Sequence, residues 1–299
     1  MIELINKSNK PKVSIGMPVY NGEKYIREAL DSLLAQTFEN FELIISDNCS
    51  TDGTSHICKE YTSRDSRVRY IRQDTNIGAL ANFQFVLEKS KAEYFMWAAY
   101  DDKWSSNWVE VLLQKLSGSI AGAAFGRVVP VDVNLKPYIH IANSQKFYFD
   151  SFRYWRKIKF YLDYEGRGKA NLFYSLFKRD WIKQVNLLNN TNDYSIIYDS
   201  MSKFGYLSVK STFLFKRNHT DNEGNIFSSQ TPLIKKIMNN ILPLPLKLFC
   251  EYLKSSNFLE KSLVISLLPV KFCVAYYWLT ISYFLKRGLL SKKTSKSQI

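Results

Sequence analysis

Apolar runs and helical spacings of apolar residues alternate over residues 13–129. Strands are predicted at 13–17, 41–46, 68–72, 94–99 and 120–129. Between the first two strands, apolar side chains recur at intervals of three and four, which is typical of an amphipathic helix: Tyr25, Ile26, Ala29, Leu30, Leu33 and Leu34. A helix is also expected after Gly53, up to about Thr62, and another over 78–90. Strands that alternate with such helices predict an α/β fold with a mostly parallel central sheet flanked by helices.

Polar residues gather where three of the predicted strands end. They occupy 18–23 after the first strand and 47–53 after the second, and Asp101 and Asp102 follow the fourth. In open parallel sheets, ligands bind beyond the carboxyl ends of the strands. The three clusters are therefore predicted to line one crevice.

The chain after residue 130 is less regular. Aromatic and basic residues are interleaved over 147–161, which fits an amphipathic helix, a site for a sugar or lipid head group, or stacking on nucleic-acid bases. We do not expect the protein to bind nucleic acid through this stretch or elsewhere. From about residue 232 the pattern is that of a helical appendage, so we divide the chain into 1–230 and 231–299.

The segment 263–285 is apolar and aromatic, but Pro269 and Lys271 interrupt it. The uninterrupted part, Phe272 to Leu285, has 14 residues, whereas a bilayer-spanning helix needs about 20. Basic residues without acidic ones follow directly: Lys286, Arg287, Lys292, Lys293 and Lys296. This combination favours a helix that lies on an anionic membrane surface. A buried helix with a solvated tail is the alternative.

Composition narrows the class of protein. Hydrophobic residues make up 46% and charged residues 23%, which excludes a wholly disordered chain, a collagen-like fibre and a polytopic membrane protein. The net charge of +14 favours an anionic partner. Four cysteines without a CxxC motif, and an N-terminus without a long apolar run, predict a protein on the cytoplasmic side. With the C-terminal segment, this predicts a location peripheral to the membrane.

Several nucleotide and nucleophile motifs are missing from the sequence. It contains no GxxxxGK[ST] loop, no GxGxxG after a strand, no zinc-ligand spacing and no GxSxG elbow. The predicted crevice carries carboxylates and amides instead. Because Mg²⁺ and Mn²⁺ commonly share one or two carboxylates with substrate phosphates, this crevice suits a metal-bridged diphosphate.

Three stretches resemble the family 2 glycosyltransferases, which have the GT-A fold. VSIGMPVYNGEKYIREALDSLLAQTF is similar to that family's first strand, loop and helix, and ELIISDNCSTDGT to its second strand and turn. DTNIGALANFQFVLEKSKAEYFMWAAYDDKW resembles the run into its acidic metal motif. The resemblance implies a GT-A domain over 1–230, with a nucleotide-sugar-binding half at 12–125 and an acceptor-side half at 126–230.

The resemblance also implies roles for individual residues. Asp47 would accept a hydrogen bond from the base, which favours uracil or thymine (UDP or dTDP) and leaves GDP open. Asp102 and Asp101 would form the acidic motif that holds Mg²⁺ or Mn²⁺ on the diphosphate. Asp101 would also lie near the ribose. Which of the two touches the metal is left open. The other residues of the nucleotide-binding set would border the donor: Pro18, Tyr20, Asn21, Glu23, Asn76 and Gly78.

Each cluster also has a purely structural interpretation. The segments 47–53 and 76–78 contain ordinary turn residues, and Asp101 and Asp102 precede an expected helix near Ser105, where its dipole favours acids. The sequence also departs from the family at Ala99, where many relatives carry a further Asp. The adjacent acidic pair is retained, so we expect metal binding with fewer carboxylates.

The catalytic base is sought in 191–205. The resemblance places it at Asp193, at a helix start, although Asn192 replaces the usual preceding Glu; Asp199 is the alternative. Downstream, Arg217 and His219 stand where relatives carry a basic pair, and would contact the diphosphate or acceptor side or complete the metal shell.

The expected function is an inverting, metal-dependent transfer of one sugar to an acceptor hydroxyl. The QxxRW motif of the family's processive synthases is absent from the sequence. The apolar tail, together with the family resemblance, implies a saccharide or lipid-linked saccharide acceptor in surface polysaccharide biosynthesis. A sugar-phosphate nucleotidyltransferase and a catalytically degenerate, membrane-associated nucleotide-sugar-binding module are the alternatives.

Overall fold

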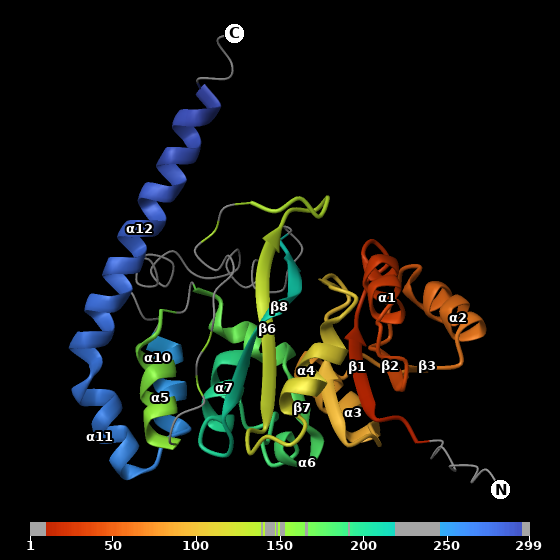
Figure 1. Cartoon of the computed structure of the whole chain (residues 1–299), viewed down its shortest axis with the longest axis horizontal. Helices are drawn as coiled ribbons and strands as arrows, with labels where there is room; N and C mark the ends of the chain where they lie inside the picture. The colour runs from red at the N-terminus through yellow and green to blue at the C-terminus, as the bar shows by residue number, and fades with distance from the viewer. Residues whose placement is uncertain are drawn as a thin grey trace, which may run out of the picture.

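One eight-stranded sheet, in the order β3-β2-β1-β4-β7-β6-β8-β5, forms the centre of the computed structural model (Figure 1). The structure describes residues 10–138, 140, 147, 149, 153–164, 167–190, 192–218 and 246–294. Four of the strand pairings described are parallel (β1 with β2 and with β4, β2 with β3, β6 with β8), and β7 and β5 add antiparallel ones. The predicted α/β class with a flanked central sheet is confirmed. The strands are β1 (Val13–Val19), β2 (Phe41–Asp47), β3 (Val68–Arg72), β4 (Tyr94–Trp97), β5 (Lys103–Trp104), β6 (Ala123–Val131), β7 (Leu176–Lys178) and β8 (Tyr206–Arg217).

The helices of the first half follow the predicted pattern closely. They are α1 (Ile26–Leu34), α2 (Thr54–Arg64), α3 (Ala79–Lys89) and α4 (Trp108–Leu116). The last begins three residues after Ser105, where a helix was expected. The apolar face of α1 is buried against the sheet, with Ile26, Ala29, Leu30 and Leu33 all inaccessible to solvent.

Strand β1 continues through Pro18, although the sequence predicted that the apolar run ends there. The carbonyl of Gly16 accepts a hydrogen bond from the Ala98 N–H on the β4 side, so Pro18, two residues on, also turns its nitrogen to that side. The β1–β4 ladder ends at Gly16. The missing N–H of Pro18 therefore breaks no ladder bond.

The carboxyl ends of the parallel strands lie level with one another. Val19 is in register with Asp47, and Asp47 with Arg72. The three polar clusters therefore follow the same edge of the sheet, as the sequence predicted.

The second half of the chain completes this edge from the other side. Strand β8 runs antiparallel to β5, with Lys103 opposite Phe215, so its last residues reach Asp102 and Asp101. Between Phe125 and Arg127 the β6–β8 register shifts. Gly126 lies at this bulge, where an added Cβ would come within 2.7 Å of the Thr212 carbonyl oxygen, so the close approach of the two strands requires glycine there.

Three C-terminal helices lie on the side of the molecule opposite β1–β3 (Figure 1). These are α10 (Leu246–Lys254), α11 (Phe258–Ser266) and α12 (Leu268–Thr294). They pack on α5 (Arg153–Leu162) and α7 (Asp193–Ser200). The helix α5 confirms the amphipathic-helix interpretation of the aromatic, basic stretch.

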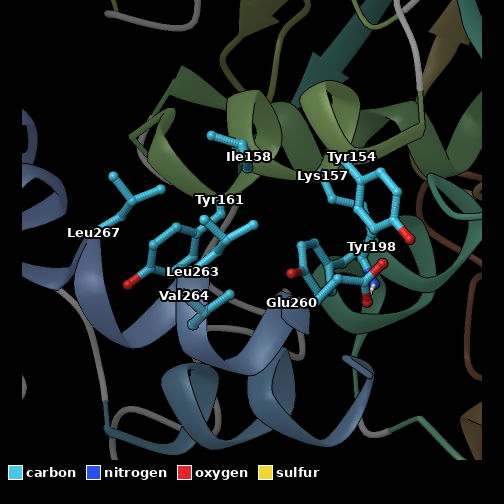
Figure 2. A pocket seen from close by; sticks show the side chains of 9 residues that line it. All are labelled: Tyr154, Lys157, Ile158, Tyr161, Tyr198, Glu260, Leu263, Val264 and Leu267. Atoms are coloured by element: carbon cyan, nitrogen blue, oxygen red, sulfur yellow. Dashed lines mark hydrogen bonds and ion pairs between the residues drawn. The ribbon is translucent and has the colours of Figure 1, made fainter. Parts of the chain in front are cut away.

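A buried ion pair joins α11 to α5. The Lys157 Nζ donates to Glu260 Oε2 at 2.7 Å and to the Ser255 carbonyl at 2.8 Å, and both side chains are almost fully buried. Glu260 also closes a capping box with Asn257 at the start of α11. Figure 2 shows this pair beside Tyr198 in a small pocket between α5, α7 and α11. The residues that line this pocket include none of the predicted site residues.

The long helix α12 does not meet the length and apolarity that a membrane span requires, and neither does any other helix in the described residues. Lys271, which interrupts the apolar segment in the sequence, points inward. Its side chain is fully buried and its Nζ donates to the Asp163 carbonyl at 2.6 Å. The outward face of α12 is therefore not interrupted by this charge.

Candidate active site

Asp101 and Asp102 lie between β4 and β5, directly before Lys103, and both are buried. The Asp102 carboxylate accepts hydrogen bonds from the Lys216 Nζ at 2.8 Å and from the Arg217 backbone N–H at 3.0 Å. Burial raises the pKa of Asp102 to about 6; Lys216 opposes this shift and Asp101 adds to it. The antiparallel β5–β8 pairing creates this arrangement, because it sets Lys103 opposite Phe215 and so brings the next residues of β8 against the acidic pair.

Lys216 belongs to this site, although the sequence analysis did not single it out. Its Nζ lies 4.8 Å from the centre of the Tyr174 ring and its side chain is 29% exposed. The pKa of Lys216 is raised because Asp102, Tyr174 and Asp101 outweigh the desolvation that opposes its charge. Lys216 is therefore a protonated, partly shielded cation at the acidic pair.

Arg217 has contacts that differ from the expected ones. Its side chain is 2% exposed and its guanidinium stacks 4.6 Å from the centre of the Tyr25 ring. It forms an ion pair with Glu28 of α1 and donates to the backbone carbonyls of Asp101 at 2.8 Å and Val133 at 2.6 Å. These contacts tie α1, the acidic segment and the end of β6 together. His219, predicted next to it, lies outside the described residues.

Asp193 is the first residue of α7 and its side chain is exposed to solvent. Asn192 caps the helix, because its Oδ1 accepts the Ser195 N–H at 3.0 Å. Desolvation by the surrounding protein raises the pKa of Asp193, with its own backbone N–H and Lys216 opposing the shift. Lys216 thus acts electrostatically on Asp193 as well as on Asp102, and α7 packs on the helix η2 (Lys169–Tyr174), whose Tyr174 ring lies beside Lys216.

Asp199, the alternative base, lies farther along α7. Its carboxylate pairs with Lys203 at 3.1 Å, one turn later in sequence. It also acts electrostatically on Lys157 of α5, which belongs to the joint with the C-terminal helices. The contacts of Asp199 are therefore those of a helix-surface ion pair.

The loops after β1 and β2 are locked together by reciprocal hydrogen bonds. The Glu23 carboxylate accepts the Gly53 N–H at 2.8 Å, and the Glu23 N–H donates to Asp52 at 3.0 Å. Asn21, in the left-handed region at φ 51°, accepts the Thr51 N–H at 2.8 Å. Glu23 and Asn21 therefore shape the loops, while Tyr20 remains 41% exposed and Pro18 is buried in β1.

Asp47 is fully buried at the end of β2, and its carboxylate is already bonded on several sides. It accepts the Ser50 N–H at 2.8 Å, the Tyr70 hydroxyl at 2.7 Å and the Arg72 guanidinium at 2.7 Å. Arg72 is 38% exposed and was not singled out from the sequence. Only the strand register, which sets Asp47 opposite Arg72, reveals this pair.

Asn76 and Gly78 form the turn that leads into α3. The Asn76 Oδ1 accepts the Asn48 amide and the Gly78 N–H, at 2.8 and 2.9 Å. Gly78 has φ 85°, and a Cβ there would meet nothing within 4 Å. The turn interpretation is therefore satisfied, and the space beside Gly78 is open.

The acidic pair offers the oxygen ligands that Mg²⁺ and Mn²⁺ prefer, but too few for a complete protein shell. Among the residues that the structure describes, no group of three or more His, Cys, Asp or Glu side chains gathers to hold a metal. Protein-bound Mg²⁺ often takes one or two carboxylates and completes its shell with water and substrate phosphates. Asp101 and Asp102 therefore fit a cation that is shared with a bound diphosphate.

Comparison with known proteins identifies a family for most of this region. Residues 14–185 match the profile described as glycosyl transferase family 2, which is more than half of the 299 residues. The putative teichuronic acid biosynthesis glycosyltransferase TuaG of Bacillus subtilis is 36% identical over 105 residues, 35% of this chain and 42% of the relative. The glycosyltransferase GlyG of Streptococcus pneumoniae is 30% identical over 135 residues, 45% of each chain. The chain thus matches less than half the length of these relatives.

Solved structures share the fold at low sequence identity. TarS of S. aureus, in complex with UDP-GlcNAc, aligns with a TM-score of 0.59 and 19% identity, over 86% of this chain and 70% of that one. The mannosyltransferase PcManGT from Pyrobaculum calidifontis, in complex with GDP-Man and Mn²⁺, aligns with a TM-score of 0.55 and 13% identity, over 97% and 81%. These likenesses confirm the predicted GT-A-type fold. Asp193 and Lys216 lie beyond the 14–185 match, so their assignment depends on the geometry above.

Proposed function

Because the chain belongs to glycosyl transferase family 2, we propose that it moves one sugar from a nucleotide diphosphate sugar to an acceptor hydroxyl, with inversion at the transferred carbon. The observation that carries this proposal is the joint placement of Asp102, Lys216 and Asp193. Lys216 donates a hydrogen bond to Asp102 and acts electrostatically on Asp193, at the edge where open parallel sheets bind ligands.

Asp193 is the proposed general base. The acceptor hydroxyl loses its proton as its oxygen bonds to the sugar, and a carboxylate within hydrogen-bond reach takes that proton. Asp193 suits this role because it is exposed to an incoming hydroxyl, while its raised pKa makes it a stronger base than an ordinary aspartate.

Mg²⁺ or Mn²⁺ is the proposed cofactor, held by Asp102 together with Asp101. A divalent cation at this position would neutralise charge on the departing diphosphate. Mn²⁺ is present with GDP-Man in the structure of PcManGT, which supports the assignment. The predicted contribution of His219 remains a hypothesis.

The proposed donor is a UDP or dTDP sugar, with a GDP sugar as the alternative. Its base would lie near Asp47 and Arg72 and its ribose near Asp101, with Tyr20, Asn76 and Gly78 bordering the nucleotide. The exposed Tyr20 ring and the open space at Gly78 support these positions. TarS binds UDP-GlcNAc in its crystal structure, which supports uracil.

A thermal-denaturation panel tests the donor. We expect UDP or dTDP to raise the melting temperature in the presence of Mn²⁺ and to have a smaller effect with EDTA, with CMP as the control. A ligand that binds only the folded state adds about 2.7 kcal/mol to the free energy of unfolding at 100 times its dissociation constant. Folded protein that no nucleoside diphosphate stabilises, with or without Mn²⁺, would contradict the proposed function.

We further propose that the acceptor is a saccharide or lipid-linked saccharide in surface polysaccharide biosynthesis, reached from the cytoplasmic face of the membrane. The name of the relative TuaG, which refers to teichuronic acid biosynthesis, supports the pathway class. The outward face of α12 supports the membrane. It carries Val270, Cys273, Tyr276, Tyr277, Thr280 and Tyr283, at helical spacing and all exposed.

Vesicle sedimentation tests this membrane contact. The full chain should sediment with vesicles that contain phosphatidylglycerol and much less with neutral phosphatidylcholine, and salt should weaken binding because the basic tail contributes electrostatically. Replacing both Tyr276 and Tyr277 by Ser should reduce the bound fraction severalfold. Ile120→Ser, at an exposed apolar side chain outside these helices, is the matched control. Equal sedimentation of all three proteins would contradict this surface.

A further inference from the structure

Two adjacent basic residues end β8, and the structure gives them different surroundings. Arg217 turns into the protein, where Glu28 balances its charge and two backbone carbonyls accept its hydrogen bonds. Lys216 turns to the acidic pair and lies against the face of the Tyr174 ring. Side chains on a strand alternate between its two faces, and of these two it is the Lys216 side chain that contacts the Asp102 carboxylate.

The charge of the site explains why a cation is needed there. Asp101 and Asp102 are adjacent and buried, and Asp193 interacts electrostatically with Lys216. A diphosphate would bring further negative charge to this surface. A divalent cation and Lys216 together would offset that charge, whereas Arg217 is already paired with Glu28.

We infer that Lys216 is a donor-binding residue whose ammonium group contacts the sugar-bearing phosphate of the nucleotide diphosphate sugar. This inference rests on the proposed function. A lysine ammonium carries three donors on a flexible stem, so Lys216 can donate to Asp102 and to a phosphate oxygen together, or turn from one to the other. The ammonium lies over the Tyr174 ring, 4.8 Å from its centre. The side chain is 29% exposed, which leaves a route to a ligand.

The contact also has a role in the transfer step. The bond between the sugar carbon and the diphosphate oxygen breaks, and its electron pair stays on that oxygen. The acceptor oxygen forms the new bond to carbon, and its proton passes to Asp193. An ammonium in contact with the leaving diphosphate stabilises the charge that develops there.

The test separates the diphosphate from the rest of the nucleotide. Dissociation constants are measured by calorimetry on the full chain with Mn²⁺, for UDP and UMP, dTDP and dTMP, and GDP and GMP. Lys216→Gln should raise the dissociation constant of the diphosphate that the wild-type protein binds by about ten- to a hundredfold, the range for hydrogen bonds to charged groups. The dissociation constant of the matching monophosphate should change by less than about threefold, because it lacks the phosphate that this ammonium reaches.

Three controls make the result specific. Lys216→Arg keeps the charge and should restore much of the diphosphate affinity, and Lys210→Gln, at an exposed lysine on the same strand, should bind like the wild type. Thermal denaturation checks that each variant is folded. Equal affinity of Lys216→Gln and wild type for the diphosphate, or an equal loss for both nucleotides, would overturn the inference while leaving the proposed function in place. Wild-type protein that binds none of the six nucleotides would overturn the proposed function, and this inference with it.

Discussion

Asp193→Asn is expected to lower the turnover number by about 10²- to 10⁴-fold, the range for loss of a general base. The substitution keeps the size and the helix-starting position of the side chain, but an amide cannot take the acceptor proton. Nucleotide affinity should stay close to that of the wild type, since the predicted donor contacts lie elsewhere. Initial rates at saturating donor and acceptor, together with nucleotide binding, measure the two effects separately.

The matched control is Asp199→Asn on the same helix. Asp199 pairs with Lys203 on the flank of α7, so its neutralisation should change turnover by only a few-fold. If Asp199→Asn abolishes turnover and Asp193→Asn does not, the assignment of the base is wrong. An unaffected rate in both variants would mean that the base is neither of these two aspartates. A wild-type protein that binds the nucleotide sugar without turnover would favour the degenerate binding module.

The raised pKa of Asp193 also sets the direction of the pH dependence. A base acts only when it is deprotonated, and desolvation raises the pKa of Asp193 above the usual aspartate range. The rate of the wild type should therefore fall, as the pH is lowered, at a higher pH than an ordinary aspartate would give.

Glu260→Gln is expected to destabilise the protein by about 3–5 kcal/mol, the range for breaking one partner of a buried ion pair. The substitution leaves the Lys157 ammonium buried without its counter-charge and weakens the capping box at α11. Urea denaturation followed by circular dichroism measures the loss.

Two further variants identify the cause of that loss. Glu93→Gln removes a partner from the exposed pair with Lys12 and should change the free energy of unfolding by less than about 1 kcal/mol. Replacing Lys157 by Met and Glu260 by Leu together removes both charges, and should recover much of the stability because apolar pairs often replace buried ion pairs well. If Glu260→Gln unfolds like the wild type, the pair does not hold the C-terminal helices in place.

The strands of the first half were predictable because their apolar runs indicate directly which residues are buried. Strands β1 and β2 are interior strands with a neighbour on each side, so their apolar runs are almost continuous, and the polar residues that end them mark the carboxyl edge. The acidic pair follows from the same pattern. For these residues, the position at the end of a strand in the sequence is enough to place them at the carboxyl edge of the sheet.

The surroundings of Lys216, Arg217 and Lys271 could not be read in the same way. Which of two adjacent residues on β8 faces the acidic pair depends on the β6–β8 register, and the bulge at Gly126 alters that register. Lys271 interrupts the apolar segment in the sequence, but in the structure its buried ammonium donates to the Asp163 carbonyl. Each case depends on a contact between segments far apart in the chain, which local periodicity does not record.

The pairing of β5 with β8 has a consequence for how the protein is made. Asp102 leaves the ribosome more than a hundred residues before Lys216, its counter-ion. Chains generally fold from the N-terminus as they emerge, so β1 to β4 can form while the acidic pair still lacks its β8 neighbours. The donor site is therefore completed late in synthesis, when the last residues of β8 close over a core that is already folded.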